Sequence, residues 1–596
     1  MLMILIQWCY FALTSFLTGF AALAPFQKNS AYRIRCAGSY MMAGLLVLNV
    51  YAEYFSLFSG VGLWANALAA AFDLCAAAVL RKRITAFLRE WRSRTGKGKA
   101  LLYLLLLLLF AYGSSRGYMH YDTGLYHAQA IRWIEEYGVV PGLANLHSRF
   151  GYNSAAFALC ALFGGAGLTK YPMHCVAGFF ALLCAVRCTG LLTLARRRRV
   201  RLTDFLYAGC IFYLVAVFRE LVSPASDYFA MLILFWVVIC WAELWESGER
   251  EPLPFCLLSL YLVYAATVKL STAVLLVLAL YPAVLLVQKI KERCAQGARP
   301  AAACLPVLGW LSLGFAVALP YLARNVLISG WLFYPFTFFD WFSVDWKLSK
   351  GYADSDAREI RAYAMQIFDV YKLDTPFSVW FPNWLKSQDR LDRLLVLAGW
   401  AALPVSALLA GCGVYRGAGG GPKKNGPKKR GSSQAGFPPL AFALLQACAL
   451  LGFLFWQFGA PLVRYGYFYV LFLPLAAFGS LYVMAADAWE AYGRERRGSG
   501  RLGFYLFTGL LVAFLAYKGY NLIQMIRELG GQPYYIWQQD YGDDPAYTYE
   551  VDGVTIYVPT DRGQIGYSKF PSSPVEQDIE LRGGTLRSGF RARKEK

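Results

Sequence analysis

The sequence predicts an all-α polytopic membrane protein with about 14 transmembrane helices. The chain of 596 residues is 58% hydrophobic and only 16% charged, whereas soluble domains average roughly 25% charged residues. Its apolar residues form runs that reach the roughly 17–25 residues a helix needs to cross a hydrocarbon layer about 30 Å thick. Lysine and arginine gather in short segments between these runs, which is typical of cytoplasmic loops.

The basic segments assign each loop to one side of the membrane, because short loops rich in Lys and Arg stay in the cytoplasm. Both termini and the segments 113–150, 323–388 and 521–596 are therefore placed outside. The spans are expected at 2–24, 36–58, 60–80, 100–113, 174–195, 204–222, 228–246, 254–268, 271–288, 302–322, 391–411, 437–458, 465–486 and 503–520. The span at 254–268 and its successor are short, and we expect two half-helices that meet at Lys269.

The same assignment divides the chain into five parts. These are an N-terminal three-span extension (1–99), a membrane portion (100–411) with outer loops 113–173 and 323–388, a basic disordered cytoplasmic linker (412–436), C-terminal membrane helices (437–520) and an extracytoplasmic tail (521–596). Residues 151–168 are apolar, but a crossing there would place Arg196 outside, so an interfacial or re-entrant helix is expected. Alternating side chains around Asp552 and Gly553 predict a β-hairpin in the tail.

Charge placement and cysteine placement exclude other classes of protein. The net charge of +21 is divided among short loops, whereas a nucleic-acid-binding protein presents one continuous basic face, so we exclude nucleic acid as a partner. None of the 14 cysteines lies in the segments placed outside, so no disulfide framework is expected. Residues 1–26 lack a basic n-region and a small-residue cleavage site, and we expect them to remain as a span.

The first outer loop holds the residues best suited to chemistry. Three of the four histidines, His120, His127 and His147, lie there with Asp122 and Gln129. Asp122 directly follows a span and should sit at the outer membrane boundary, where partial desolvation raises the basicity of a carboxylate. One alternative is that Asp122 only caps the next helix. Another is a zinc site made by Asp122 and the three histidines, although their spacing matches no common zinc motif.

A second carboxylate, Asp227, lies in a short outer connection after Ser223 and Pro224. It should reach the same depth as Asp122, and two carboxylates at one boundary can divide the roles of general base and cation ligand. The alternative is a turn made by Ser223 and Pro224 and capped by Ser226 or Asp227.

Four cationic residues are expected at the same boundary, against the positive-inside bias. They are Arg149, Lys269, Arg324 and Arg464. An arginine fork matches phosphate geometry and lysine acts as a point charge. With Gln129 and His147 they form a candidate basin for an anionic headgroup. For each cation alone, the alternative is snorkelling at the end of a span.

These residues resemble the GT-C superfamily of polytopic glycosyltransferases, and within it a group of bacterial multi-pass membrane proteins. The resemblance covers 100–596 in scattered blocks. It rests on Asp122, His127, Trp133, Gly138, Pro141, Asn145, His147, Phe150, Asn153, Ser223, Pro224, Asp227, Lys269, Ser271, Arg324, Asn325, Ser329, Gly330, Tyr334, Pro335, Pro461 to Gly466, Glu580 to Gly583 and Gly589 to Arg591. Two departures are the three spans before the acidic loop, and a single aspartate in that loop where the family has an acidic pair.

The resemblance implies a transferase that uses a polyprenyl-phosphate-linked sugar donor and a cell-envelope glycan or lipid acceptor. Asp122, His127 and Asp227 would be catalytic, and the basic residues would hold the lipid phosphate. The implied place is the cell membrane, among membrane lipids, with an extracytoplasmic active face. The resemblance implies no definite cofactor. A divalent cation stays open, although the single loop aspartate argues against metal dependence. The alternatives are a polysaccharide polymerase or ligase, a lipid or solute transporter, and a non-enzymatic scaffold.

Overall fold

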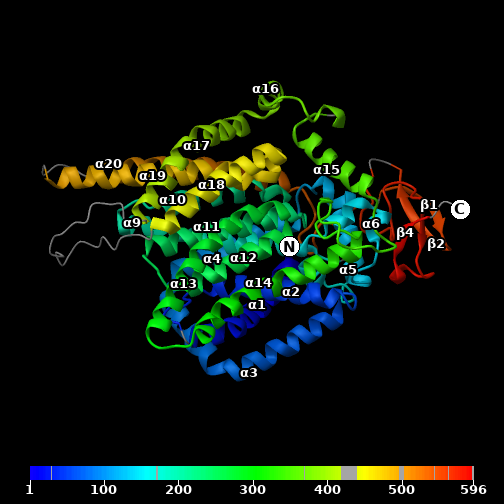
Figure 1. The fold of residues 1–596 in the computed structure, drawn as a ribbon, viewed down its shortest axis with the longest axis horizontal. Helices are drawn as coiled ribbons and strands as arrows, with labels where there is room; N and C mark the ends of the chain where they lie inside the picture. The colour runs from blue at the N-terminus through cyan, green and yellow to red at the C-terminus, as the bar shows by residue number, and fades with distance from the viewer. Residues whose placement is uncertain are drawn as a thin grey trace.

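The computed structural model describes residues 1–28, 30–169, 172–367, 369–417, 439–495, 502–542, 544–560 and 563–593. Helices that lie side by side along the long axis form most of the molecule, and a few short strands lie at one end (Figure 1). Within these residues, 11 helices are long and apolar enough to cross a membrane. The protein is therefore a polytopic helical protein, as its composition predicts.

Most of the 11 candidate spans are single uninterrupted helices, and two contain a tighter 3₁₀ section. They are α1 (Leu2–Lys28), α3 (Leu63–Arg94), α4 (Lys97–Ser115), α8 (Val176–Cys188) continued by η3 (Thr189–Thr193) and α9 (Leu194–Arg197), α11 (Ser226–Glu246), η5 (Leu270–Ala279) continued by α13 (Leu280–Ala295), α14 (Pro300–Ser329), α17 (Arg390–Gly417), α18 (Pro439–Gly459), α19 (Val463–Glu495) and α20 (Leu502–Leu529).

The other three segments expected to cross form helices that do not combine the length and the apolar composition of a membrane span. α10 (Leu202–Ala216) and α12 (Pro252–Val268) are shorter apolar helices. α2 (Ala37–Ser56) is long enough but carries buried polar side chains, among them Asn49 and Glu53. The expected break at Lys269 is present, because the backbone there is extended (φ −150°, ψ 113°) between α12 and η5.

The apolar stretch 151–168 forms a short buried helix, which excludes the interfacial alternative and does not contradict the re-entrant one. Here α7 (Ala155–Phe163) has nine residues, all of them buried. At about 1.5 Å per residue it is less than half as long as a membrane crossing. Four short elements of the first outer loop precede it. These are η1 (Thr123–His127, one turn of π-helix), α5 (Ala128–Glu136), α6 (Leu143–Leu146) and η2 (Ser148–Tyr152), which holds Arg149.

The tail contains the predicted β-hairpin. Strands β1 (Ala546–Val551) and β2 (Val554–Pro559) pair antiparallel, with Val551 opposite Val554. The two turn residues have positive φ, 47° at Asp552 and 81° at Gly553, as a two-residue hairpin turn requires. The remaining short elements are η4 (Phe218–Glu220), α15 (Lys350–Ala364), η6 (Val370–Lys372), α16 (Phe377–Ser387), β3 (Ile579–Leu581), η7 (Leu586–Ser588) and β4 (Phe590–Ala592), where β3 pairs antiparallel with β4.

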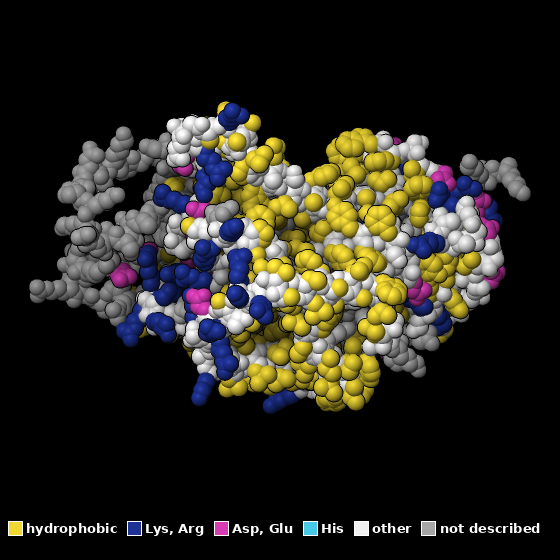
Figure 2. All heavy atoms as spheres, turned by 90° about the horizontal axis from the view of Figure 1, so that it is seen from below, with side chains coloured by type: hydrophobic (Ala, Val, Ile, Leu, Met, Phe, Trp, Pro, Cys, Tyr) yellow, Lys and Arg dark blue, Asp and Glu magenta, His cyan; other side chains and the backbone are white. Residues whose placement is uncertain are grey.

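The three segments expected outside meet at one end of the molecule (Figure 1). The Phe590 amide donates to the Pro141 carbonyl at 3.0 Å, and Arg582 pairs with Asp345 at 2.9 Å. The amino group of Met1 donates to the Tyr534 carbonyl at 3.1 Å. At the other end, Lys and Arg side chains crowd the surface beside a broad hydrophobic band (Figure 2). Of the expected linker 412–436, α17 includes 412–417, and 418–436 lies outside the described residues.

Candidate functional site

Asp122 lies where the chain leaves α4 and enters the first outer loop. It directly precedes η1, but its side chain makes no capping hydrogen bond to that helix. Its carboxylate instead accepts from Arg464 Nη2 at 3.1 Å and lies 3.7 Å from Arg149 Nη1. The side chain keeps 18% of its surface exposed, so solvent or a ligand can reach it. Asp122 is therefore not a helix cap, and its partners are cations from distant parts of the chain.

Asp227 occupies the first turn of α11, where Ala225 is the cap residue and no side chain caps the helix. Its carboxylate pairs with Lys269 and lies 3.7 Å from Arg464 Nε. Lys269 reaches this position because the chain is extended there between two helices. The break at Lys269 thus places a cation beside the helix start that holds Asp227.

Arg464 connects the two carboxylates. It lies in the first turn of α19, two residues before a kink at Gly466 (φ −130°, ψ 22°). A Cβ at Gly466 would lie 2.1 Å from Trp456 Cδ1, so only glycine lets the indole pack against this turn. Arg464 also contacts the His120 ring. Since Asp122 and Asp227 both reach one guanidinium, they belong to a single cluster, which we call the Arg464 cluster: Asp122, Arg149, Asp227, Lys269 and Arg464.

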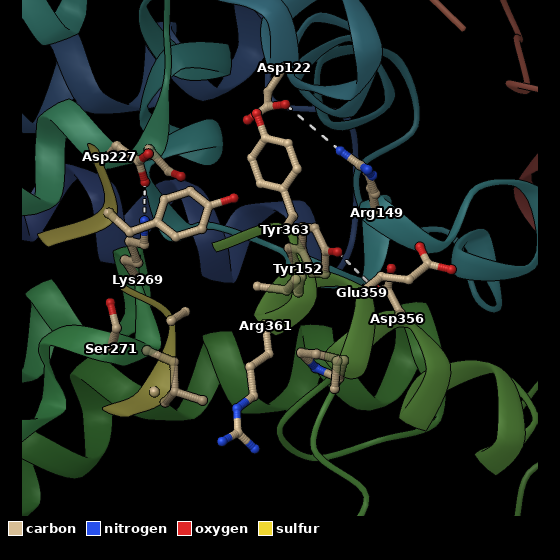
Figure 3. A pocket seen from close by; sticks show the side chains of 18 of the residues that line it. Asp122, Arg149, Tyr152, Asp227, Lys269, Ser271, Asp356, Glu359, Arg361 and Tyr363 are labelled. Atoms are coloured by element: carbon tan, nitrogen blue, oxygen red, sulfur yellow. Dashed lines mark hydrogen bonds and ion pairs between the residues drawn. The ribbon is translucent and has the colours of Figure 1, made fainter. Parts of the chain in front are cut away.

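A cavity of about 910 Å³ opens beside the Arg464 cluster. Six of the nine residues proposed from the sequence line it, namely Asp122, His127, Arg149, Asp227, Lys269 and Arg464. Figure 3 shows the Asp122–Arg149 pair and the Asp227–Lys269 pair on different sides of the cavity. Much of the remaining wall is apolar or aromatic, including Phe336, Ile360, Phe455 and Phe458. The cavity therefore offers both charged and apolar lining residues.

The other three proposed residues lie away from this cavity. Gln129 donates to the carbonyl of Lys569 at 2.7 Å and so holds the tail. His147 is 5% exposed and its Nε2 has no hydrogen-bond partner among the described residues. Arg324 is 1% exposed and donates to Asn153 Oδ1 at 2.9 Å and to Ser56. These three side chains are bound or enclosed by the protein, so they offer no donor to a ligand in the cavity.

The histidines of the first loop are neutral groups. Burial lowers the pKa of His127 to about 3, and it lowers the pKa of His147 to about 3 as well. Burial and the nearby Arg464 charge lower the pKa of His120 from its ordinary value. The positive charge at the cavity therefore comes from Arg149, Lys269, Arg361 and Arg464, of which all but Arg361 belong to the Arg464 cluster.

One wall of the cavity comes from α15, which the sequence did not single out. Asp356, Glu359, Arg361 and Tyr363 of this helix line the cavity (Figure 3). Asp356 Oδ2 accepts from Tyr152 at 2.8 Å and from Tyr334 at 2.9 Å, and burial raises the pKa of Asp356. The apolar residues at 353, 357, 360 and 364 recur at helical spacing, which would have predicted a helix there, though not its position.

No cluster for zinc forms in the described ranges, where no group of three or more His, Cys, Asp or Glu side chains is arranged to hold a metal ion. The two carboxylates that were expected to divide the roles of general base and cation ligand both lie beside the Arg464 guanidinium. A carboxylate beside a cavity can accept a proton. The three cations of the Arg464 cluster can bind an anion.

Comparison with known proteins identifies the family and no more. The chain belongs to the family described as a domain of unknown function, DUF8201, whose model matches residues 1–471. The match includes α1 to α3, so these helices are part of the family domain. It also includes Asp122, Asp227, Lys269 and Arg464. Neither the comparison with curated proteins nor that with solved structures gives a significant match.

Proposed function

We propose that this protein is a membrane glycosyltransferase that transfers a sugar from a polyprenyl-phosphate-linked donor to a cell-envelope acceptor on the extracytoplasmic face. The observation that carries the proposal is the Arg464 cluster, in which one guanidinium holds two carboxylates beside a cavity. A lipid-linked sugar phosphate has a charged head and an apolar tail, and the cavity has cations for the first and apolar side chains for the second. Arginine is well matched to its phosphate group.

The formal charge of the cluster favours an anionic ligand. Arg149, Lys269 and Arg464 contribute three positive charges, and Asp122 and Asp227 contribute two negative charges. A donor phosphate competes with both carboxylates for Arg464. When the phosphate takes this guanidinium, the Asp122 carboxylate loses its closest cation and becomes a better proton acceptor.

The reaction is a displacement at the anomeric carbon of the sugar. The acceptor hydroxyl gives its proton to Asp122 as its oxygen forms the new bond to the anomeric carbon. The bond from that carbon to the phosphate oxygen breaks, and its electron pair stays on the polyprenyl phosphate. Arg464 and Lys269 stabilise the charge that develops on the leaving phosphate. Asp227 keeps both cations in place through its two ion pairs.

The composition of the α15 wall favours a transferase over a polymerase or ligase. For a polymerase or ligase, we expect an arginine-rich outer loop over the cavity. In the described part of the loop 323–388, Arg361 is the one lining arginine, and it is accompanied by the lining acids Asp356 and Glu359. The long loop is therefore not a predominantly cationic surface.

The test is Asp122→Asn, which keeps the size of the side chain and removes its basicity. Membranes with matched amounts of each variant are given a panel of radiolabelled polyprenyl-phosphate hexoses, and transfer to envelope material is measured. We expect the rate of transfer to fall by about 10²–10⁴-fold, the usual loss on removing a general base. Asp340→Asn, an exposed carboxylate of the long loop, is the matched control and should keep the wild-type rate. Equal rates for Asp122→Asn and wild type would contradict the proposal.

A further inference from the structure

A second cavity, of about 530 Å³, lies far from the Arg464 cluster. It is enclosed by the connection from α1 to α2, by the last turns of α8 and α11, and by the start of α12. Glu243 on α11 lines it, whereas Asp227 in the first turn of the same helix belongs to the Arg464 cluster. Sixteen residues of helix separate these two side chains, which corresponds to about 24 Å. The second cavity therefore lies toward the basic end of the molecule.

Three arginines and two glutamates line this second cavity, and the glutamates are already satisfied. Glu243 accepts from Arg187 and from the Tyr207 hydroxyl. Glu249 Oε1 accepts from the backbone amides of residues 250 and 251, both at 2.9 Å. The acidic groups thus have protein donors, and they need no cation from outside.

The arginines keep unused hydrogen-bonding capacity. Arg187 contacts Glu243, yet its Nε is buried without a hydrogen-bond partner among the described residues. Arg33 donates to the carbonyl of Gln27, which occupies one nitrogen of its guanidinium. Arg35 forms no ion pair or hydrogen bond in the described ranges and is exposed. A buried donor without an acceptor costs free energy, so an anion that accepts from Arg187 Nε removes that cost. Arg33 and Arg35 are exposed and add positive charge beside it.

The rest of the lining is apolar and belongs to membrane helices. Leu23 of α1, Trp236 of α11, and Leu257, Leu258 and Tyr261 of α12 contribute to it. A free inorganic anion needs no such wall, whereas the acyl chain of a lipid does. Basic pockets between membrane helices on the cytoplasmic side recognise lipid phosphate groups in this way.

We propose that this second cavity binds an anionic phospholipid, with the phosphate held by Arg33, Arg35 and Arg187 and an acyl chain along Trp236 and α12. Such a lipid contacts the α1–α2 connection, α8, α11 and α12 together. It therefore stabilises the fold by binding to the folded state alone. The proposal does not depend on the transferase reaction at the other cavity.

The experiment compares the purified full chain, in detergent micelles, with and without added phosphatidylglycerol. Thermal unfolding is followed at increasing lipid, and lipids retained by the protein are counted by native mass spectrometry. The test variant is Arg33→Gln with Arg35→Gln. The matched control is Arg89→Gln with Arg92→Gln, which removes two exposed cations of α3 outside the cavity. Phosphatidylcholine and inorganic phosphate are tested in parallel.

We expect phosphatidylglycerol to raise the unfolding temperature of the wild type and of the control equally. The test variant should bind this lipid at least about tenfold more weakly, since each arginine near a lipid phosphate contributes a factor of about five. Leu257→Trp, which narrows the apolar wall without changing charge, should also weaken binding. Phosphatidylcholine and inorganic phosphate should give smaller shifts. Equal shifts from phosphatidylcholine, equal shifts from inorganic phosphate, or unchanged binding by the test variant would each overturn the proposal.

Discussion

Two arginines that the sequence places at the same boundary have opposite surroundings in the structure. Arg464 is 31% exposed in its side chain, lines the large cavity and reaches two carboxylates. Arg324 is 1% exposed, lies outside that cavity and donates to Asn153 and Ser56. Asn153 continues this buried network, because its amide donates to Asn325 Oδ1 at 2.8 Å.

The comparison shows that residue type and depth do not distinguish an arginine that faces a cavity from one that the protein encloses. Arg324 meets neutral acceptors and the field of buried Glu53, so it holds α14 against α2 and η2. Arg464 meets two carboxylates that line the cavity with it, so a ligand in the cavity can reach its guanidinium. Access to a cavity, and not the charge itself, separates the two arginines.

Of the two arginines, Arg464 should give the larger effect when it is replaced. Arg464→Gln removes the guanidinium that faces the leaving phosphate in the proposed reaction, and the rate of sugar transfer should fall by about 10²–10³-fold. Arg464→Lys should recover part of this rate, because it restores a point charge but not the fork. The unfolding temperature of each variant is measured in parallel. A normal transfer rate in Arg464→Gln would show that the cluster is only structural.

Arg324→Gln should act on stability and not on chemistry. Removing a buried charge whose neighbours depend on it typically costs about 3–5 kcal/mol of unfolding free energy. Arg299→Gln, an exposed arginine at the start of the same helix, is the matched control and should change stability by less than about 0.5 kcal/mol. Thermal unfolding in detergent measures both. If Arg324→Gln were as stable as its control, the distinction between the two arginines would fail.

The pH dependence of stability tests whether His147 is enclosed. Its pKa is about 3 in the folded protein and 6.5 in the unfolded chain, so the unfolded chain binds the extra proton between these values. The enclosed neutral His147 therefore costs no stability above pH 6.5, and the free energy of unfolding falls progressively as the pH falls from 6.5 toward 3. Each such histidine makes unfolding free energy fall by about 1.4 kcal/mol per pH unit in that window. His147→Phe should reduce the slope by this amount, measured by unfolding between pH 4.5 and 7.5. An unchanged slope would mean that His147 is protonated when folded.

The smallest effects should come from the hydroxyls that hold α15 over the cavity. Tyr152→Phe and Tyr334→Phe each remove one hydrogen bond to Asp356, and each should cost about 1 kcal/mol. Because both bonds end on one oxygen, the two losses should not add, and the double variant measures the coupling. Strict additivity would show that Asp356 does not join the two tyrosines. Tyr363→Phe, on the cavity side of the same helix, provides a comparison.

Much of the architecture was predictable because it depends on local properties of the chain. Runs of apolar residues predicted the helices, and the extended backbone at Lys269 followed from two short runs placed back to back. Asp552 and Gly553 predicted the hairpin turn through their tolerance of positive φ. The run 151–168 was expected to form a helix that does not cross the membrane, either interfacial or re-entrant. The nine residues of α7 are covered by protein, which excludes the interfacial alternative. An apolar run alone could not decide this, because it does not record whether lipid or protein surrounds a helix.

The sequence by itself determined which groups are available: two carboxylates, a few cations and several histidines near the ends of helices. It could do so because charge is costly in hydrocarbon and is therefore confined to boundaries. The tertiary structure alone decided which of these groups meet. Asp122, Asp227 and Arg464 come from segments more than 100 residues apart, and the burial of Arg324, His147 and Gln129 depends on packing against α2, the first loop and the tail. Burial and proximity are properties of the folded chain, because both arise from contacts between distant segments. The distance between two segments along the sequence does not show whether they touch.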